Sequence, residues 1–234
     1  KEDILSNGHI VGLLGIRGAG KDTCASTLVQ AHGFTRAAFA DDLYQEVADA
    51  FGVSVAFLSN RDTKEAPLSE LALERCRNAD FVRVVLQLQG YGYKRRWVMR
   101  AKRSPRWVLQ FWGTEYRRRS QYGTDSYWLD RVASRLRSSP DGHFVITDVR
   151  FVNEARFILD KGGVLVRVRR ESLEQKAQEE RRLNKGAGTH SSETELLDFP
   201  VWRELYNIEN NPEALALASA RLADELDRLK TTAA

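Results

Sequence analysis

The stretch GLLGIRGAGKDTCAS, residues 12–26, decides the fold. It joins an apolar run, HIVGLLGI at 9–16, to a glycine-rich turn and then to a segment of helix-forming residues. A near-continuous apolar run of this length is typical of a strand that is buried on both faces of a parallel sheet. We therefore predict a strand over 10–15, a tight turn, and a helix over 21–31.

Three residues of the turn, Gly15, Gly20 and Lys21, have the GxxxxGK spacing of a phosphate-binding loop. Glycines let successive backbone amides turn inward around phosphate oxygens, and the lysine reaches the terminal phosphates. Because the strand and the helix supply the context that this motif requires, we predict a nucleoside triphosphate site rather than a tight turn with a surface lysine. Its contacts are predicted to come from Gly15, Arg17, Gly18, Ala19, Gly20, Lys21, Asp22 and Thr23.

Asp22 stands where such a loop normally carries Ser or Thr. A carboxylate is as hard an oxygen ligand for Mg²⁺ as a hydroxyl, so Asp22 could replace that hydroxyl directly or through water. Thr23 can still offer its hydroxyl and amide to a phosphate. The alternative is that Asp22 only adds a favourable negative charge to the first helical turn.

Strand and helix patterns alternate along the rest of the chain. Strands are predicted over 34–40, 143–149, 163–169 and 204–210, and helices over 41–51, 68–78, 82–88, 152–161, 172–184 and 212–229, with two more beginning near Ser104 and Asp125. This alternation predicts an α/β fold with a doubly wound, parallel five-stranded sheet of the P-loop NTPase type, flanked by helices. We expect one domain over 1–234, with a helical insertion over about 41–140.

The composition narrows the class of protein. The formal net charge is +4, and 42% of the residues are hydrophobic. No apolar run near the start is long enough for a bilayer or has the features of a signal peptide. The two cysteines, Cys24 and Cys76, lack metal-ligand spacing and suit buried thiols in a reducing compartment. We therefore expect a cytoplasmic protein with anionic partners, nucleotides or nucleic acids, and no membrane partner.

A carboxylate ends the strand predicted over 143–149. Asp148 would lie beside the phosphate-binding loop, where it could hold magnesium or its waters, or it could cap the following helix. Arg150 follows on the same edge. Its guanidinium could clamp an acceptor phosphate, or it could pair with Glu154.

The segment 93–119 holds ten Lys or Arg residues and one acid, interleaved with aromatic residues. Helical spacing places Val108, Trp112 and Tyr116 on a core face. The opposite, polar face carries Gln110, Thr114 and Arg117, which are candidates for contacting an acceptor base and phosphate. The basic run at 93–103 could also be a solvated face.

Several further stretches resemble the deoxynucleoside monophosphate kinases of bacteriophages. They are GKDT at 20–23, FADDL at 39–43, RDTKE at 61–65, LQFWGTEYRR at 109–118, YW at 127–128, TDVRFVNEA at 147–155, GGVLVRVRR at 162–170 and HSSE at 190–193. The resemblance covers most of the chain. It implies transfer of a phosphoryl group from ATP, with Mg²⁺, to a deoxynucleoside 5′-monophosphate for phage DNA synthesis in the infected cell.

The resemblance also implies an acceptor site in the predicted insertion. Asp41 would face the acceptor nucleotide, whereas its alternative role is to cap a helix. Arg61 and Lys64 would bind the acceptor phosphate, or belong to a solvated charged loop. The substrate-binding candidates are Asp41, Arg61, Lys64, Gln110, Thr114, Arg117, Trp128, Arg150 and Glu154.

Kinases of small nucleotides need a mobile lid that brings cations onto the transferring phosphoryl group and excludes water. We predict this lid over about 170–193, with glycines at 186 and 188 as hinges, and with His190 and Glu193 ordering it. Arg181 and Arg182 could instead pair with glutamates on their helix. The catalytic candidates are Lys21, Asp148, Arg170 and Arg182, and the magnesium candidates are Asp22, Thr23 and Asp148.

Two other functions are compatible with the phosphate-binding loop. One is a kinase that acts on a modified base or an end within DNA, for which 93–119 would be a nucleic-acid groove. The other is an ATP-hydrolysing DNA-associated factor without an acceptor site. A small-molecule acceptor is favoured over nucleic acid. The preferred base, the choice between ribose and deoxyribose, and the presence of a homodimer stay open.

Overall fold

Five strands form one parallel sheet in the order β2-β3-β1-β4-β5 in the computed structural model, which describes residues 8–89, 95–183, 195–209 and 211–233. The strands are β1 (Ile10–Leu14), β2 (Thr35–Ala37), β3 (Phe144–Ile146), β4 (Val164–Arg169) and β5 (Arg203–Tyr206). In the central strand, Val11 pairs with Val145 of β3 and with Val164 of β4. Together with the helices on its faces, this sheet confirms the predicted α/β class and is consistent with a P-loop kinase fold.

The chain divides into two compact units. Unit 1 consists of Lys1–Phe39 and Val132–Ala234, and unit 2 of Ala40–Arg131. Unit 1 contains the whole sheet, together with α1 (Lys21–His32), α8 (Val152–Asp160), α9 (Glu171–Leu183) and α10 (Pro212–Ala233).

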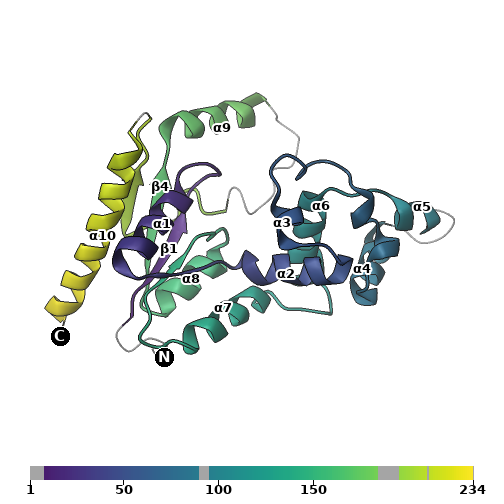
Figure 1. Cartoon of the computed structure of the whole chain (residues 1–234), viewed down its shortest axis with the longest axis horizontal. Helices are drawn as coiled ribbons and strands as arrows, with labels where there is room; N and C mark the ends of the chain where they lie inside the picture. Colours follow the sequence, from purple (N-terminus) through teal and green to yellow (C-terminus); the bar gives the residue numbers. More distant parts are fainter. Residues whose placement is uncertain (1–7, 90–94, 184–194, 210, 234) are drawn as a thin grey trace. The chain divides into compact units, whose positions relative to one another are not determined.

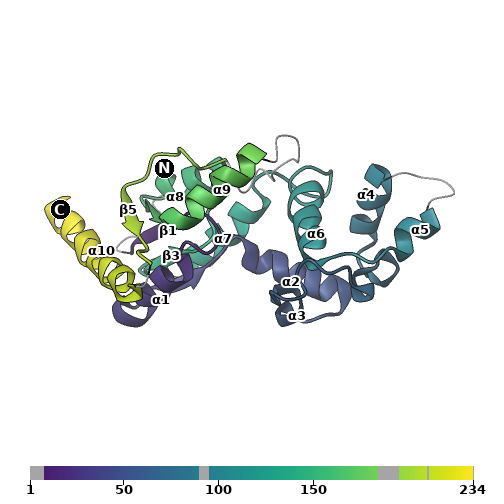
Figure 2. The same ribbon diagram turned by 90° about the horizontal axis from the view of Figure 1, so that it is seen from above.

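Helices cover both faces of the sheet because successive β1 side chains point to opposite sides. Val11 and Leu13 pack in one core cluster with Leu28 of α1 and Leu222 of α10, and Figure 1 shows α10 running beside α1. Gly12 faces the other side, where a Cβ atom would lie 2.5 Å from Cδ1 of Ile158 in α8. Figure 2 shows α1 and α8 on opposite sides of β1. The sheet is therefore doubly wound.

The regular elements described in unit 2 are helices joined by turns and loops, with one isolated β-bridge between Leu68 and Arg103. Unit 2 contains α2 (Ala40–Phe51), α3 (Val55–Ser59), α4 (Ala79–Gln89), α5 (Arg95–Arg100), α6 (Pro105–Gln110), the π-helix η3 (Phe111–Tyr116) and the first turn of α7 (Tyr127–Arg137). Aromatic side chains form its core: the Phe81 ring lies 4.4 Å from that of Trp112 and 5.6 Å from that of Tyr116, centroid to centroid. With Val108 also buried, the predicted core face is confirmed.

Two of the predicted helices are wrong in part. Residues 68–78 form two short 3₁₀ turns, Ser69–Leu71 and Leu73–Arg75, because Leu71, Ala72 and Leu73 are all buried and three consecutive residues cannot share one face of an α-helix. The helix that begins at Ser104 is α-helical only to Gln110, and then continues as η3. The sequence patterns also missed the short helices α3 and α5.

Element ends differ from the predictions by a few residues. The second strand stops at Ala37 because α2 already begins at Ala40, and α7 begins at Tyr127 rather than directly after Asp125. The part of the chain that the structure describes contains no helix with both the length and the apolar character needed to cross a membrane.

Candidate nucleotide-binding site

The glycine-rich turn connects β1 to α1 in a backbone conformation that only glycine adopts easily. Gly15, Gly18 and Gly20 have φ angles of 136°, 82° and 111°. At Gly15 a Cβ atom would also collide with the carbonyl oxygen of Val168 in β4. The turn is thus held against the neighbouring strand, with its last glycine at the N-terminus of α1.

Lys21 folds back over this turn. Its Nζ donates hydrogen bonds to the carbonyl oxygens of Gly15, at 2.6 Å, and Ile16, at 2.9 Å. Burial, followed by the charge of Arg150, lowers the pKa of Lys21 to about 8, while Asp22 and Asp148 act in the opposite direction. Two cations and two carboxylates therefore interact at the end of β1 where phosphates are predicted to bind.

Asp148 lies two residues beyond β3, at the carboxyl end of the sheet. Its Oδ1 accepts a hydrogen bond of 2.8 Å from the backbone N–H of Phe39, which ties the ends of β2 and β3 together. Asp148 is not the cap of α8. At that helix start, Oε2 of Glu154 accepts from the backbone N–H groups of Arg150, at 2.8 Å, and Phe151, at 3.1 Å.

Asp22 and Thr23 are exposed in the first turn of α1. The described residues contain no group of three or more His, Cys, Asp or Glu side chains that could hold a metal unaided. This composition suits magnesium, which commonly binds to one or two protein carboxylates and completes its shell with phosphate oxygens and water. Asp22, Thr23 and Asp148 fit that mode, and the metal ligands stay a prediction.

Arg150 and Glu154 do not form the ion pair that the sequence left open. Glu154 is only 2% exposed and interacts with Arg150 through the backbone N–H of that residue. The Arg150 guanidinium is exposed. The chemistry of Arg150 therefore permits it to bind an anion, whereas the carboxylate of Glu154 is already engaged at the start of α8.

Asn207 anchors the phosphate-binding loop, and the sequence patterns missed it. It follows β5, and its Nδ2 donates to the carbonyl oxygen of Ala19 at 2.8 Å. Its backbone N–H donates to the carbonyl oxygen of Arg169. The same Nδ2 lies 2.7 Å from the position of a Cβ atom on Gly20. The available signal was a polar residue just after a strand of the parallel sheet, where ligand-binding residues of this fold class gather.

The arginines of β4 have different environments. Arg167 and Arg169 are committed to ion pairs with Glu204, and Arg169 also contacts Glu174 at 2.7 Å. Arg170, just after the strand, has its Nη2 atom 3.4 Å from Glu209. Its buried Nε finds no hydrogen-bond partner among the described residues. The Nε–H group of Arg170 is therefore still available to donate a hydrogen bond, whereas the guanidinium groups of Arg167 and Arg169 are engaged in ion pairs.

Part of the predicted lid is described. Helix α9 begins at Glu171, and Leu173 lies 3.3 Å from the position of a Cβ atom on Gly18, so the helix starts beside the phosphate-binding loop. Arg182 is exposed near the end of α9. The predicted hinge glycines at 186 and 188, and His190 and Glu193, lie outside the described residues.

The acceptor candidates of unit 2 divide into engaged and available side chains. Trp128 is 2% exposed and donates its indole N–H to the carbonyl of Gly113 at 3.1 Å. Lys64 donates to the hydroxyl of Tyr44, and Thr114 is buried within η3. The half-buried Gln110 and the exposed Arg61 make no side-chain hydrogen bond or ion pair that involves another described residue. Asp41 occupies the first turn of α2.

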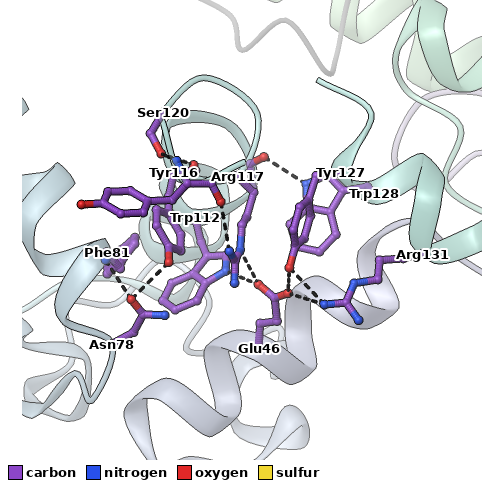
Figure 3. A network of polar contacts seen from close by, with 12 residues as sticks. Glu46, Asn78, Phe81, Trp112, Tyr116, Arg117, Ser120, Tyr127, Trp128 and Arg131 are labelled. Atoms are coloured by element: carbon purple, nitrogen blue, oxygen red, sulfur yellow. Dashed lines mark hydrogen bonds and ion pairs between the residues drawn. The ribbon is translucent and has the colours of Figure 1, made fainter. Parts of the chain in front are cut away.

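Glu46 organises unit 2, and the sequence analysis did not single it out (Figure 3). One carboxylate oxygen accepts from Trp112 Nε1 and from Arg117 Nε, each at 2.8 Å. The other accepts from the Tyr127 hydroxyl and from Arg131 Nη2, the latter at 3.4 Å. Burial, and then the hydrogen bond to Glu46, raise the pKa of Tyr127, which keeps the phenol protonated as a donor.

The guanidinium of Arg117 is thus engaged by other side chains of unit 2. Besides Glu46, its guanidinium lies over the rings of Tyr127 and Tyr116, at 4.5 and 4.6 Å from the centroids. The sequence did carry a signal for this cluster. Leu43, Val47 and Phe51 form the apolar stripe of α2, and Glu46 interrupts it at a position that helical spacing turns inward.

No known protein-family model matches the chain. The chain is 27% identical over 205 residues to a protein of Acanthamoeba polyphaga mimivirus named "Putative deoxynucleotide monophosphate kinase". The matched region covers 80% of this chain and 81% of the mimivirus protein. The likeness extends over most of both chains, and at this identity it gives weak support to a kinase assignment.

The network around Glu46 predicts a stability effect. Glu46→Ala removes the carboxylate that four donors share, two of them arginines. The variant should lower the free energy of unfolding by about 2–4 kcal/mol. Urea unfolding followed by tryptophan fluorescence measures this loss. Glu74→Ala is the matched control, because Glu74 pairs with Arg100 in an exposed ion pair, and it should cost no more than about 0.5 kcal/mol. Equal losses in the two variants would contradict the structural role of Glu46.

Proposed function

We propose that this protein transfers the terminal phosphoryl group of ATP to a deoxynucleoside 5′-monophosphate. One observation carries the proposal: a GxxxxGK turn lies between the central parallel strand and a helix, and Arg150, Asp22 and Asp148 lie near enough to Lys21 to affect its pKa. The name of the mimivirus relative supports the same reaction class. The resemblance of the sequence motifs to bacteriophage enzymes adds the deoxynucleotide as acceptor and a role in viral DNA synthesis.

The donor side of the proposal belongs to unit 1. The amides of 15–20 would surround the phosphates of ATP, and Lys21 would exchange its two carbonyl partners for phosphate oxygens. Asp22, Thr23 and Asp148 would orient Mg²⁺ or its waters. When bound, the ion would neutralise charge that develops on the phosphates.

The acceptor candidates of unit 2 are considered by themselves, and Arg150 of unit 1 stays a separate candidate for an acceptor phosphate. Among the described candidates of unit 2, Gln110 and Arg61 have side chains without a hydrogen-bond partner, so we assign them to the acceptor base and phosphate. Lys64 and Asp41 complete this set. Thr114, Arg117, Trp128 and Glu154 were predicted to touch the acceptor; their observed burial or contacts suit them better to shaping the surrounding structure, and direct contact stays a prediction.

Catalysis would consist of positioning and electrostatic stabilisation. A monophosphate acceptor is already ionised and needs no strong base, so no general base is assigned. Arg170, whose Nε lacks a partner among the described residues, and Arg182 are the cations that we assign to charge developing between donor and acceptor. Exclusion of water would favour transfer over hydrolysis.

The proposal predicts acceptor-dependent release of ADP. With ATP, Mg²⁺ and each of dAMP, dGMP, dCMP and dTMP in turn, at least one acceptor should raise ADP release at least tenfold above the rate without acceptor. Lys21→Ala should lower that stimulated rate by a factor of at least about 100 while leaving the circular dichroism spectrum unchanged. Asp22→Ser should retain activity and magnesium dependence. Acceptor-independent hydrolysis, or full activity of the Lys21 variant, argues against the proposal.

The lowered pKa of Lys21 predicts proton uptake on nucleotide binding. In the free protein the ammonium form is favoured only below a pKa of about 8, whereas bound phosphates favour it at higher pH. Binding of ATP with Mg²⁺ should therefore take up almost no proton through Lys21 at about pH 6.5, and about 0.9 proton at about pH 9, with affinity falling as the pH rises. Calorimetry in two buffers of different ionisation enthalpy measures the difference between the two pH values. In Lys21→Arg, which stays charged, that difference should disappear; if it persists, another group is responsible.

A further inference from the structure

Helix α5 presents the most exposed of the large hydrophobic side chains in the described part of the molecule. Trp97 is 80% exposed, and Leu88 at the end of α4 is 60% exposed. Tryptophan is highly buried on average in proteins, and an exposed indole offers a flat face on which another planar ring can stack. Neither the donor nor the acceptor residues of the proposed kinase include Trp97.

The end of α5 is held firmly. Arg103, only 6% exposed, donates to the carbonyl oxygens of Val98, at 2.8 Å, and Ala101, at 2.9 Å. Its guanidinium also lies 4.8 Å from the ring centroid of Trp107 in α6. A buried cation therefore satisfies carbonyl groups at the end of α5 and joins this short helix to its neighbour.

The surface around Trp97 is strongly basic. Residues 95–103 contain five Lys or Arg residues and no acid. Arg95 and Arg96 are exposed, and they have no hydrogen bond or ion pair with any other described residue. Lys102 is exposed as well, while Arg100 pairs with Glu74 at 3.2 Å. Two arginines that directly precede Trp97 in the chain are thus available to a partner.

A shallow hollow of about 310 Å³ adjoins the C-terminal end of α5. It is lined by residues that include Lys102, Arg103, Trp107 and Glu65, and the Glu65 carboxylate pairs with Arg106. The Trp107 ring is already stacked on Phe111 and lies against the Arg103 guanidinium, so the exposed Lys102 is the cation of the hollow that we assign to a phosphate.

We propose that α5 and the adjoining hollow form a docking site for single-stranded nucleic acid. A base would stack on the exposed face of Trp97, and backbone phosphates would lie against Arg95, Arg96 and Lys102. Stacking on an aromatic side chain within a basic surface is the usual way in which proteins bind single strands without reading their sequence. This inference does not depend on the proposed kinase reaction.

Charge and shape favour this partner over an anionic membrane surface. A helix that lies on a membrane presents a broad apolar face. α5 has six residues, and its other apolar side chains, Val98 and Met99, are already half-buried within unit 2. One exposed indole among cations is sufficient for a stacked base, but it provides little apolar area for insertion into lipid.

The test is fluorescence anisotropy of labelled oligo-dT and oligo-U of about 15 nucleotides with the full chain. Both should bind, and the logarithm of affinity should fall with the logarithm of salt concentration with a slope of about −0.7 per phosphate contact, or about −2 for three contacts. Trp97→Ala should weaken binding roughly 5- to 100-fold without changing this slope. Arg95→Ala with Arg96→Ala should weaken binding and reduce the slope by about 1.4. The two oligonucleotides show whether DNA or RNA is preferred.

A matched control removes two exposed arginines elsewhere. Arg137→Ala with Arg156→Ala lowers the net charge by the same amount and should leave the slope unchanged, and ADP release by the Trp97 variant should stay at the wild-type rate. The proposal is overturned by a lack of binding at about 50 mM salt, by undiminished affinity of the Trp97 variant, or by equal effects of the two double variants. Binding to phosphatidylserine vesicles through Trp97, without oligonucleotide binding, would also overturn it.

Discussion

The close approach of the glycine-rich turn to strand β4 is the constraint on which the candidate site depends. Gly15 lies against the carbonyl oxygen of Val168, where no side chain fits, and its positive φ lets the chain leave β1 and turn toward α1. Asn207, which follows the next strand β5, also supports this turn by donating to the carbonyl oxygen of Ala19. The turn is therefore fixed by contacts with β4 and with the residue that follows β5.

The strand order brings charged side chains to both sides of this turn. β1 lies between β3 and β4, so the residues that follow those strands arrive on either side of the loop. Asp148 comes from one side and Arg170 from the other. Lys21 has a lowered pKa because its ammonium is partly buried near another cation, and anionic phosphates would relieve this unfavourable state. Anionic phosphates beside Lys21 would stabilise its ammonium form, and this stabilisation would contribute to the free energy of nucleotide binding.

Unit 2 is held together by a different kind of interaction. A single carboxylate, that of Glu46, accepts hydrogen bonds from four side chains: Trp112 of η3, Arg117 directly after η3, and Tyr127 and Arg131 of α7. The π-helix η3 widens the helix at the same place, and its Arg117 N–H bonds to the carbonyl five residues earlier, that of Trp112. Such insertions often occur at functional sites, and Gln110 lies directly before this one.

Local patterns were sufficient for the sheet and for the phosphate-binding loop. The three central strands β1, β3 and β4 are rich in apolar residues, and the glycine spacing has one physical explanation, so both could be predicted from short stretches. The 68–78 segment was mispredicted because burial of Leu71 to Leu73 comes from packing, which overrides helical propensity. Arg117 and Trp128 were assigned to substrate, since a sequence does not reveal which polar group finds a partner inside the protein. Glu46 and Asn207 were missed because their partners are 66 to 188 residues away in the chain.

Phosphorus NMR of a reaction containing ATP, Mg²⁺ and the four deoxynucleoside monophosphates tests the central claim most directly. The account predicts that the γ-phosphate resonance of ATP disappears while the resonances of a deoxynucleoside diphosphate and of ADP grow in equal amounts. Inorganic phosphate should stay a minor product. Growth of inorganic phosphate and ADP alone would show that the chain hydrolyses ATP, and would contradict the assignment of an acceptor site.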